Sequence, residues 1–178
     1  MVRIACKSLV FAIVLLSLPA LAQDSAAAVA GLSGCGDPKL KFEVKPSSWK
    51  NPAQPEQGKA LVYFIEEDIN TNFVTHTSRA DIDGKSIGAT HGHSYFYFSV
   101  DPGVHHICAT TQFGVSSEEN LTAVAHFTAE AGGVYYFEIK NLSWSQPGAH
   151  DASLFPLDSD EGKFLTSSLP LVSSHQKK

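Results

Sequence analysis

The chain has 178 residues, and 13 Lys and Arg stand against 18 Asp and Glu, which gives a formal net charge of -5 at pH 7. This length predicts one ordinary domain that can bury a sizeable core without metals or many disulfides. An acidic chain without a basic cluster is poorly suited to neutralising phosphates, so we exclude nucleic acid as a partner. Gly, Pro, Ser and Thr alternate with β-branched and aromatic residues, a composition typical of mainly β proteins.

The N-terminus has the pattern of a secretion signal over residues 1–22. Arg3 and Lys7 supply a positive start, Leu9 to Leu18 form an apolar run, and Ala20-Leu21-Ala22 is a small-x-small cleavage site. The apolar run is short for a segment that spans a bilayer. We therefore expect a signal peptide that is removed, and a mature protein that is periplasmic or secreted from a bacterial cell.

The mature chain keeps two cysteines, Cys35 and Cys108. In an oxidising compartment, two cysteines predict a disulfide bond, which here would tie the N-terminal arm to the core. An alternative comes from Leu32-Ser33-Gly34-Cys35, which resembles a bacterial lipobox. Lipidation of Cys35 would make the protein a lipoprotein, with an outer-membrane location and a membrane as partner only in that case. A charged residue between the apolar run and this motif favours the disulfide.

The first part of the mature chain predicts a tether and two strands. Residues 23–38 are mostly small and predict a flexible N-terminal tether. Lys39 to Val44 alternates apolar and polar residues and predicts a first strand. Pro46 to Gly58 carries several prolines and predicts a loop. Lys59 to Glu66 is apolar on both faces, which is typical of a central strand buried on both sides.

Two tight turns organise the middle of the chain. Asp83-Gly84 predicts a hairpin between Arg79–Asp83 and a short strand at Lys85–Gly88. Tyr95 to Val100 predicts the next strand, and Asp101-Pro102-Gly103 predicts a turn from which Val104–Thr111 returns antiparallel to it.

The last part predicts two more strands and a helix. Leu121 to Ala129 alternates cleanly, and Gly132-Gly133 leads into Val134–Lys140, whose inner face holds every second residue from Tyr135. Asp158 or Ser159 predicts the cap of a short helix. Residues 173–178 predict a disordered tail. Short strands joined by turns predict an antiparallel β-sandwich of the Ig/prealbumin-like kind with a short C-terminal helix, forming one domain over residues 39–172.

Four sequence blocks occur in order: Gly58-Lys59-Ala60-Leu61-Val62-Tyr63, Asp81-Ile82-Asp83-Gly84-Lys85-Ser86-Ile87-Gly88, Asp101-Pro102-Gly103-Val104-His105-His106 and Ala131-Gly132-Gly133-Val134-Tyr135-Tyr136-Phe137. Together they resemble the bacterial family catalogued as domain of unknown function 2846, over roughly Gln57 to Val172. The Asp-Gly and Pro-Gly-x-His patterns also give a weaker similarity to PEGA-like β domains. The resemblance implies an exported β-sandwich-like domain, often on a lipoprotein, with no catalytic residues to transfer.

Eight histidines raise the question of a metal site. His91 and His93 would project to the same side of an extended strand, and His105 or His106 would supply a third imidazole for zinc or copper. The favoured interpretation is that these are ordinary polar histidines, because no acidic or cysteine ligand has close spacing with them. We therefore expect no cofactor and no metal, and keep the histidine cluster as the alternative.

Aromatic side chains provide a candidate binding surface at Tyr95, Tyr97 and Tyr136, which the strand alternation places on outward faces. No Gly-x-Ser-x-Gly nucleophile motif is present, and we expect no catalytic residues. The sequence thus predicts an exported envelope protein, not an enzyme, whose β domain has a binding or structural role toward an envelope protein or a glycan. The alternative function is a small periplasmic metal-binding or hydrolytic protein that uses the four histidines.

Overall fold

The computed structural model describes residues 35–48, 53–67, 76–113, 121–141 and 152–177. The expected signal peptide and most of the expected tether lie outside the described residues. The described elements follow one another as β1 (Phe42–Pro46), β2 (Ala60–Glu66), β3 (His76–Ile82), β4 (Lys85–Thr90), β5 (Ser94–Val100), β6 (Gly103–Phe113), β7 (Leu121–Ala129), β8 (Val134–Asn141), β9 (Ala152–Leu157), α2 (Ser159–Ser168) and β10 (Val172–Gln176).

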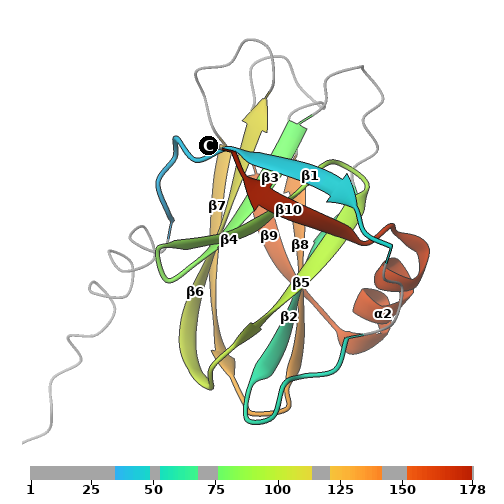
Figure 1. Ribbon diagram of the computed structural model, residues 1–178. Helices are drawn as coiled ribbons and strands as arrows, with labels where there is room; N and C mark the ends of the chain where they lie inside the picture. Colours follow the sequence, from blue (N-terminus) through green and yellow to red (C-terminus); the bar gives the residue numbers. More distant parts are fainter. Residues whose placement is uncertain (1–34, 49–52, 68–75, 114–120, 142–151, 178) are drawn as a thin grey trace, which may run out of the picture.

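The strands form two sheets of four and one ribbon of two (Figure 1). The first sheet has the order β5-β2-β8-β9, the second has the order β4-β3-β6-β7, and β1 pairs with β10. Among these strands, neighbours run antiparallel apart from β2 and β8, which are parallel. The chain is therefore mainly β with one short C-terminal helix in a sandwich-like layout, as the sequence predicts in outline.

The main core lies between the two sheets and is built largely from alternate residues of the strands in them. The inner face of β2 contributes Ala60, Val62 and Phe64, all fully buried. The opposite sheet contributes Ile107 and Ala109 from β6, among others. A fully buried aromatic or branched side chain stabilises the fold by about 1.5–3 kcal/mol. Both faces of β2 are buried, which confirms its predicted central position.

The two predicted turns behave differently. Asp83 and Gly84 have φ values of 49° and 79°, the left-handed conformation that a tight hairpin between β3 and β4 requires. Asp101-Pro102 also turns the chain, but the predicted hairpin of β5 with β6 is wrong, because the two strands belong to different sheets. The apolar faces of β5 and β6 meet across the core, so this turn carries the chain from one sheet to the other.

Helix α2 begins where the sequence predicts. Asp158 is its N-cap, and Oδ1 of Asp158 accepts hydrogen bonds from the backbone N–H groups of Asp160 and Glu161 at 2.9 and 3.0 Å. Two acidic residues in the first turn suit the positive end of the helix dipole. The helix lies against the outer face of the sheet that contains β2 and β8 (Figure 1).

Two strands were not predicted. β9 contains Pro156, which a central strand does not tolerate, but β9 is an edge strand. β10 takes up most of the expected disordered tail, because it pairs with β1 from Phe42↔Gln176 to Pro46↔Val172. Ser174 of β10 also accepts a hydrogen bond from the backbone N–H of Ala89. The ribbon thus covers the side of the sandwich that is formed by the edge strands β4 and β5.

The segment from Cys35 to Lys41 is tied to the outer face of β3 and β6, where the sequence predicts a tether up to residue 38. Cys35 forms a disulfide with Cys108 of β6. The buried guanidinium of Arg79 contacts Asp81 at 3.0 Å and donates to the carbonyl of Asp37 at 2.7 Å. A sulfur in a disulfide cannot also hold a thioether lipid, so this bond and lipidation of Cys35 are mutually exclusive.

Candidate functional site

A row of tyrosines crosses three strands on the outer face of the first sheet. Strand register places Tyr63 of β2 beside Tyr97 of β5 on one side and beside Tyr136 of β8 on the other. The rings of Tyr63 and Tyr136 stack with centroids 4.9 Å apart and planes inclined by 12°. The rings of Tyr97 and Tyr95 lie 5.7 and 6.0 Å from that of Tyr63. Pairs of aromatic rings in this range attract one another.

Helix α2 packs against the outer side of this row of tyrosines. Gly162 of the helix packs on the face of Tyr136 so closely that a Cβ atom there would lie 2.2 Å from Cγ of the ring. Tyr136 is therefore held between Tyr63 and the helix. Leu165 and Leu169 complete this second core on the helix side. The position of Tyr136 is thus set by packing on both faces of its ring.

The structure brings the predicted surface tyrosines together but covers two of them. Tyr95 and Tyr136 are only 8% and 7% exposed, whereas Tyr97 is 36% exposed. The outward direction inferred from alternation holds for all three, since each lies on the outer face of the sheet. What alternation alone does not reveal is that α2 and the chain after it lie over this face.

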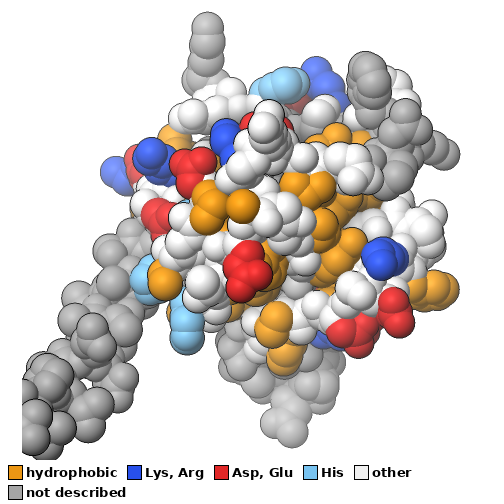
Figure 2. Space-filling model, turned by 90° about the horizontal axis from the view of Figure 1, so that it is seen from below, with side chains coloured by type: hydrophobic (Ala, Val, Ile, Leu, Met, Phe, Trp, Pro, Cys, Tyr) orange, Lys and Arg blue, Asp and Glu red, His pale blue; other side chains and the backbone are white. Residues whose placement is uncertain are grey.

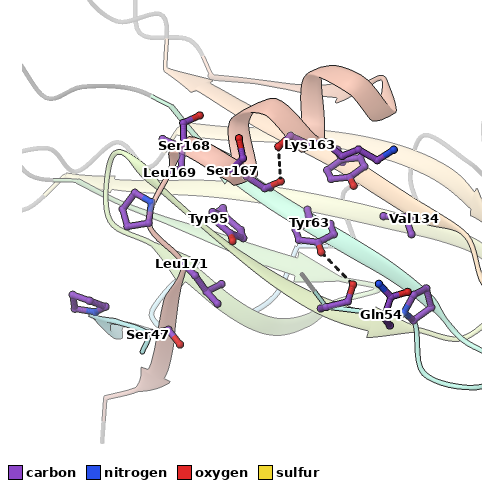
Figure 3. A pocket seen from close by; sticks show the side chains of 16 residues that line it. Ser47, Gln54, Tyr63, Tyr95, Val134, Lys163, Ser167, Ser168, Leu169 and Leu171 are labelled. Atoms are coloured by element: carbon purple, nitrogen blue, oxygen red, sulfur yellow. Dashed lines mark hydrogen bonds between the residues drawn. The ribbon is translucent and has the colours of Figure 1, made fainter. Parts of the chain in front are cut away.

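A cavity of about 870 Å³ opens between α2 and the tyrosines. Figure 3 shows Tyr63 and Tyr95 on its floor, Lys163 and Ser167 on the helix side, and Gln54 on the opposite side. This volume is within the range of small-molecule sites. The lining residues come from β1 and the chain around it, the segment before β2, three strands of one sheet, and α2 with the chain after it: Pro46, Ser47, Ala53, Gln54, Pro55, Tyr63, Tyr95, Val134, Tyr136, Lys163, Thr166, Ser167, Ser168, Leu169, Pro170 and Leu171.

The phenols of the cavity are neutral at ordinary pH. Burial, with the neighbouring tyrosines Tyr136 and Tyr95, raises the pKa of Tyr63 to about 12. Burial also raises the pKa of Tyr95, with a contribution from Tyr97, and the pKa of Tyr136. A neutral phenol both donates and accepts hydrogen bonds. Tyr63 donates to the carbonyl of Ala53 over a long 3.5 Å, and the Tyr95 and Tyr136 hydroxyls have no partner among the described residues.

On the helix side of the cavity, the side-chain hydroxyls already donate hydrogen bonds to backbone carbonyls. The side chain of Thr166 donates to the carbonyl of Gly162 at 2.8 Å, and those of Ser167 and Ser168 donate to the carbonyl of Phe164 at 2.7 and 2.8 Å. Their oxygens remain acceptors. The helix wall therefore offers acceptors to a ligand, while the floor offers phenol donors.

Sequence reasoning missed Tyr63 and the whole helix side of the cavity. The sequence predicted Tyr63 as part of a strand buried on both faces. Its pairing with Tyr97 in the neighbouring strand puts it on the same face as the outward tyrosines. Gly162 was the signal for close approach of the helix, since glycine in a helix interior often marks such contact. The segment before β2, with Gln54, carries no pattern that points to the cavity.

The four candidate histidines are not brought together. His91 and His93 follow β4, where their Nδ1 atoms lie 3.4 Å from Oγ1 of Thr77 and 3.0 Å from the carbonyl oxygen of Glu67. His105 and His106 lie near the start of β6. The end of β4, from which His91 and His93 follow, is level with Thr111 of β6. Six residues of strand separate the two places by about 20 Å. No group of three or more metal-binding side chains occurs within the described ranges.

His105 instead joins the two turns at its end of the sandwich. Its Nδ1 lies 2.7 Å from Oδ2 of Asp83, and its Nε2 lies 2.7 Å from the carbonyl oxygen of Asp101. Burial alone would lower the pKa of His105, but its hydrogen bonds to Asp101 and Asp83 outweigh burial and raise that pKa. Burial would raise the pKa of Asp83, but the backbone N–H of His106 and the His105 side chain lower it.

A second polar cluster surrounds the carboxylate of Glu66 inside the other end of the sandwich. Oε1 accepts from the hydroxyl of Ser78 and lies 2.7 Å from Nε2 of His76, and Oε2 accepts from the hydroxyl of Thr90. Ser78 and Glu66 are fully buried. The Ser78 hydroxyl donates to a carboxylate, and among its described partners no imidazole accepts its proton, so Ser78 is not arranged as a nucleophile. We interpret the cluster as a structural network that supplies hydrogen bonds to the buried carboxylate of Glu66.

The face seen from below in Figure 2 carries a central gathering of hydrophobic side chains with charged side chains around it. Among the described residues, Phe164 on α2 and Val104 on β6 are the most exposed large hydrophobic ones, at 69% and 65%. Single exposed residues of this kind are common on soluble surfaces. No helix in the described part of the chain has the length and apolar character to cross a membrane.

Comparisons with known proteins assign the chain to a family. A solved NMR structure of a protein from Eubacterium rectale is 17% identical, with a TM-score of 0.36, and the match covers 61% of this chain and 98% of that one. No curated protein matches the chain. The family model described as protein of unknown function (DUF2846) matches residues 56–153, which hold the tyrosine row but not α2, and no catalytic family is indicated. The chain therefore belongs to the DUF2846 family.

Proposed function

We propose that this protein is an exported, non-catalytic binding domain whose ligand occupies the cavity between α2 and the tyrosine row. The observation that supports this proposal is the cavity itself, about 870 Å³ in volume and floored by Tyr63, Tyr95 and Tyr136. Rigid aromatic side chains with a polar end give contact area at a low cost in side-chain entropy. We further propose that the two sheets are an Ig/prealbumin-like sandwich that serves as a rigid scaffold for this site.

The lining of the cavity supports binding over catalysis. In the described part of the chain, the lining includes no carboxylate, histidine or cysteine, and Lys163 is its one basic residue. Because the phenols have raised pKa values, none of them is a base near neutral pH. General acid–base or nucleophilic catalysis needs a group that titrates near the working pH or is activated by a neighbour.

Export is supported by the N-terminal sequence and by the cysteines. The signal pattern over residues 1–22 precedes a chain that forms one disulfide, and disulfides persist in oxidising compartments. In this proposal the mature protein is periplasmic or secreted and binds an envelope protein or glycan. An intact mass of protein from its own host tests it: a chain beginning at Gln23 supports a soluble form, and an acylated chain beginning at Cys35 makes it a lipoprotein.

The binding role is tested by blocking the cavity. Ser167→Trp places a large side chain at an exposed position of the helix wall, and Phe164→Trp introduces the same residue on the same helix at a position that does not line the cavity. Labelled protein is titrated with fractionated envelope extract and followed by amide NMR. Saturable shifts around the cavity that Ser167→Trp abolishes and Phe164→Trp preserves are expected.

Two results would overturn the binding role. Shifts that persist unchanged in Ser167→Trp would place the ligand elsewhere. Turnover of substrates in a broad hydrolase panel, retained after repurification, would show that the protein is an enzyme.

A further inference from the structure

We propose that the ligand of this cavity is a neutral oligosaccharide, an inference that rests on the proposed binding function and names its ligand class. Four properties of the site lead to it: the charge of the lining, the distribution of donors and acceptors, the apolar surface and volume of the cavity, and the pairing of the strand edges beside it.

The charge of the lining favours a neutral ligand. Among the lining residues that the structure describes, Lys163 is the one charged residue, and its position on α2 is exposed. The last turn of α2 and the residues after it also line the cavity. The C-terminal end of a helix carries a partial negative charge that disfavours anions. A strongly anionic ligand would therefore meet one solvated cation and an unfavourable helix end.

The hydrogen-bonding groups call for a ligand that both donates and accepts. On the helix wall, Thr166, Ser167 and Ser168 have donated their protons to backbone carbonyls and so offer oxygen acceptors. On the floor, the Tyr95 and Tyr136 hydroxyls remain free to donate, as far as the described residues go. Each sugar hydroxyl donates one hydrogen bond and accepts others, which matches both walls at once.

The apolar part of the lining fits the C–H surfaces of sugar rings. The edges of the stacked tyrosines, together with Val134, Leu171 and Pro55, supply contact without charge. A site with apolar walls and a few placed polar groups is typical of small-ligand recognition. The volume of about 870 Å³ is sufficient for a short oligosaccharide and too small for a folded partner.

The strand edges beside the cavity disfavour an extended peptide. β5 is an edge strand, but the backbone N–H of Tyr95 already donates to the carbonyl of Pro170 at 3.1 Å. Leu171 forms a bridge with Tyr95, and its carbonyl accepts from the N–H of Ser47 at 2.8 Å. A peptide that adds to a sheet needs unpaired edge groups. The chain has used these groups for its own residues, which leaves side chains to recognise the ligand.

The test uses neutral and charged probes on the full mature protein. Maltotetraose, cellotetraose and tetra-N-acetylchitotetraose are the neutral probes, tetragalacturonate is the anionic probe, and the capped octapeptide acetyl-(Thr-Val)4-amide is the peptide probe, since its backbone can pair with a strand edge. Titration calorimetry and amide NMR are run with each. We expect at least one neutral tetrasaccharide to bind with shifts at the cavity. We also expect no binding of the anionic or peptide probe there.

Matched variants identify the contacts. Tyr95→Phe and Tyr136→Phe keep the rings but remove the hydroxyls, and each is expected to weaken binding about five- to tenfold. Tyr97→Phe is the control, because Tyr97 belongs to the same aromatic row but does not line the cavity; its affinity should change less than twofold.

Several outcomes would overturn this inference. Binding of tetragalacturonate that falls more than tenfold in Lys163→Gln would make the ligand an anion. Binding of the capped octapeptide at the cavity would make the ligand a peptide. If no neutral tetrasaccharide binds while envelope extract still shifts the cavity residues, the ligand class is wrong and the binding function stands. If neither produces shifts there, the binding function fails as well.

Discussion

Substitution of Gly162 by alanine should reverse the usual effect of this change in a helix. In an exposed helix interior, Gly→Ala stabilises a protein by about 1 kcal/mol. Here the new Cβ would lie 2.2 Å from Cγ of Tyr136, far inside the separation of about 3.5 Å at which carbon atoms attract. Relief requires the helix or the ring to move by more than about 1 Å, and overpacking of this kind costs about 1–3 kcal/mol.

The assay is urea unfolding in a double-mutant cycle. Gly162→Ala is made in the wild-type chain and in Tyr136→Ala, and the free energy of unfolding is measured for all four proteins with the disulfide intact. A loss of about 1–3 kcal/mol is expected in the wild-type chain, and no loss in the background without the ring. A stabilised Gly162→Ala protein, or the same change in both backgrounds, would refute the contact between helix and ring.

Three further outcomes concern stability. Reduction of the Cys35–Cys108 bond, which links residues 73 positions apart, should lower the free energy of unfolding by about 4 kcal/mol, and equal urea midpoints with and without reductant would contradict this. Arg79→Leu leaves a buried carboxylate without its cation and should cost about 3–5 kcal/mol in the same assay; a loss below about 1 kcal/mol would refute its role. The raised pKa of His105 contributes stability that is fully present below pH 6.5 and is lost as the pH rises through the pKa of the folded state. The lowered pKa of Asp83 contributes stability that is present above pH 3.8 and is lost as the pH falls through the pKa of the folded state. Urea midpoints measured from pH 3 to 9 should therefore decline above pH 6.5 in the wild-type protein, and this decline should be absent in His105→Gln. The same decline in both proteins would contradict a stabilising interaction between His105 and Asp83.

Local chemistry in the sequence was enough to predict several elements of the fold. The Asp83-Gly84 hairpin and the Asp158 cap depend on residues that are close in the chain, so their patterns specify the structure directly. The alternation of Leu121 to Ala129 predicted the buried face of β7 for the same reason. Lipidation, export and the binding role remain predictions.

The elements that depend on distant partners were not predictable in this way. β10 is polar and becomes a strand because β1 lies beside it, and the turn at Asp101-Pro102 does not encode which sheet receives β6. The candidate site shows the same division. Alternation placed Tyr95, Tyr97 and Tyr136 on one side of their strands, but the parallel pairing of β2 with β8 and the covering helix, which together make the cavity, are long-range features.

The attachment of Cys35 to β6 also determines how the domain bears mechanical load. The chain ends of the β1–β10 ribbon are adjacent, since the N–H of Lys177 donates to the carbonyl of Lys41. Tension between these two points would peel the ribbon apart one pair at a time. Tension that arrives along the chain from before Cys35 passes instead through the disulfide to Cys108, in the middle of a four-stranded sheet. β1 is thereby relieved of the force, and a pull from the N-terminal side is resisted by covalent bonds and the sheet around β6.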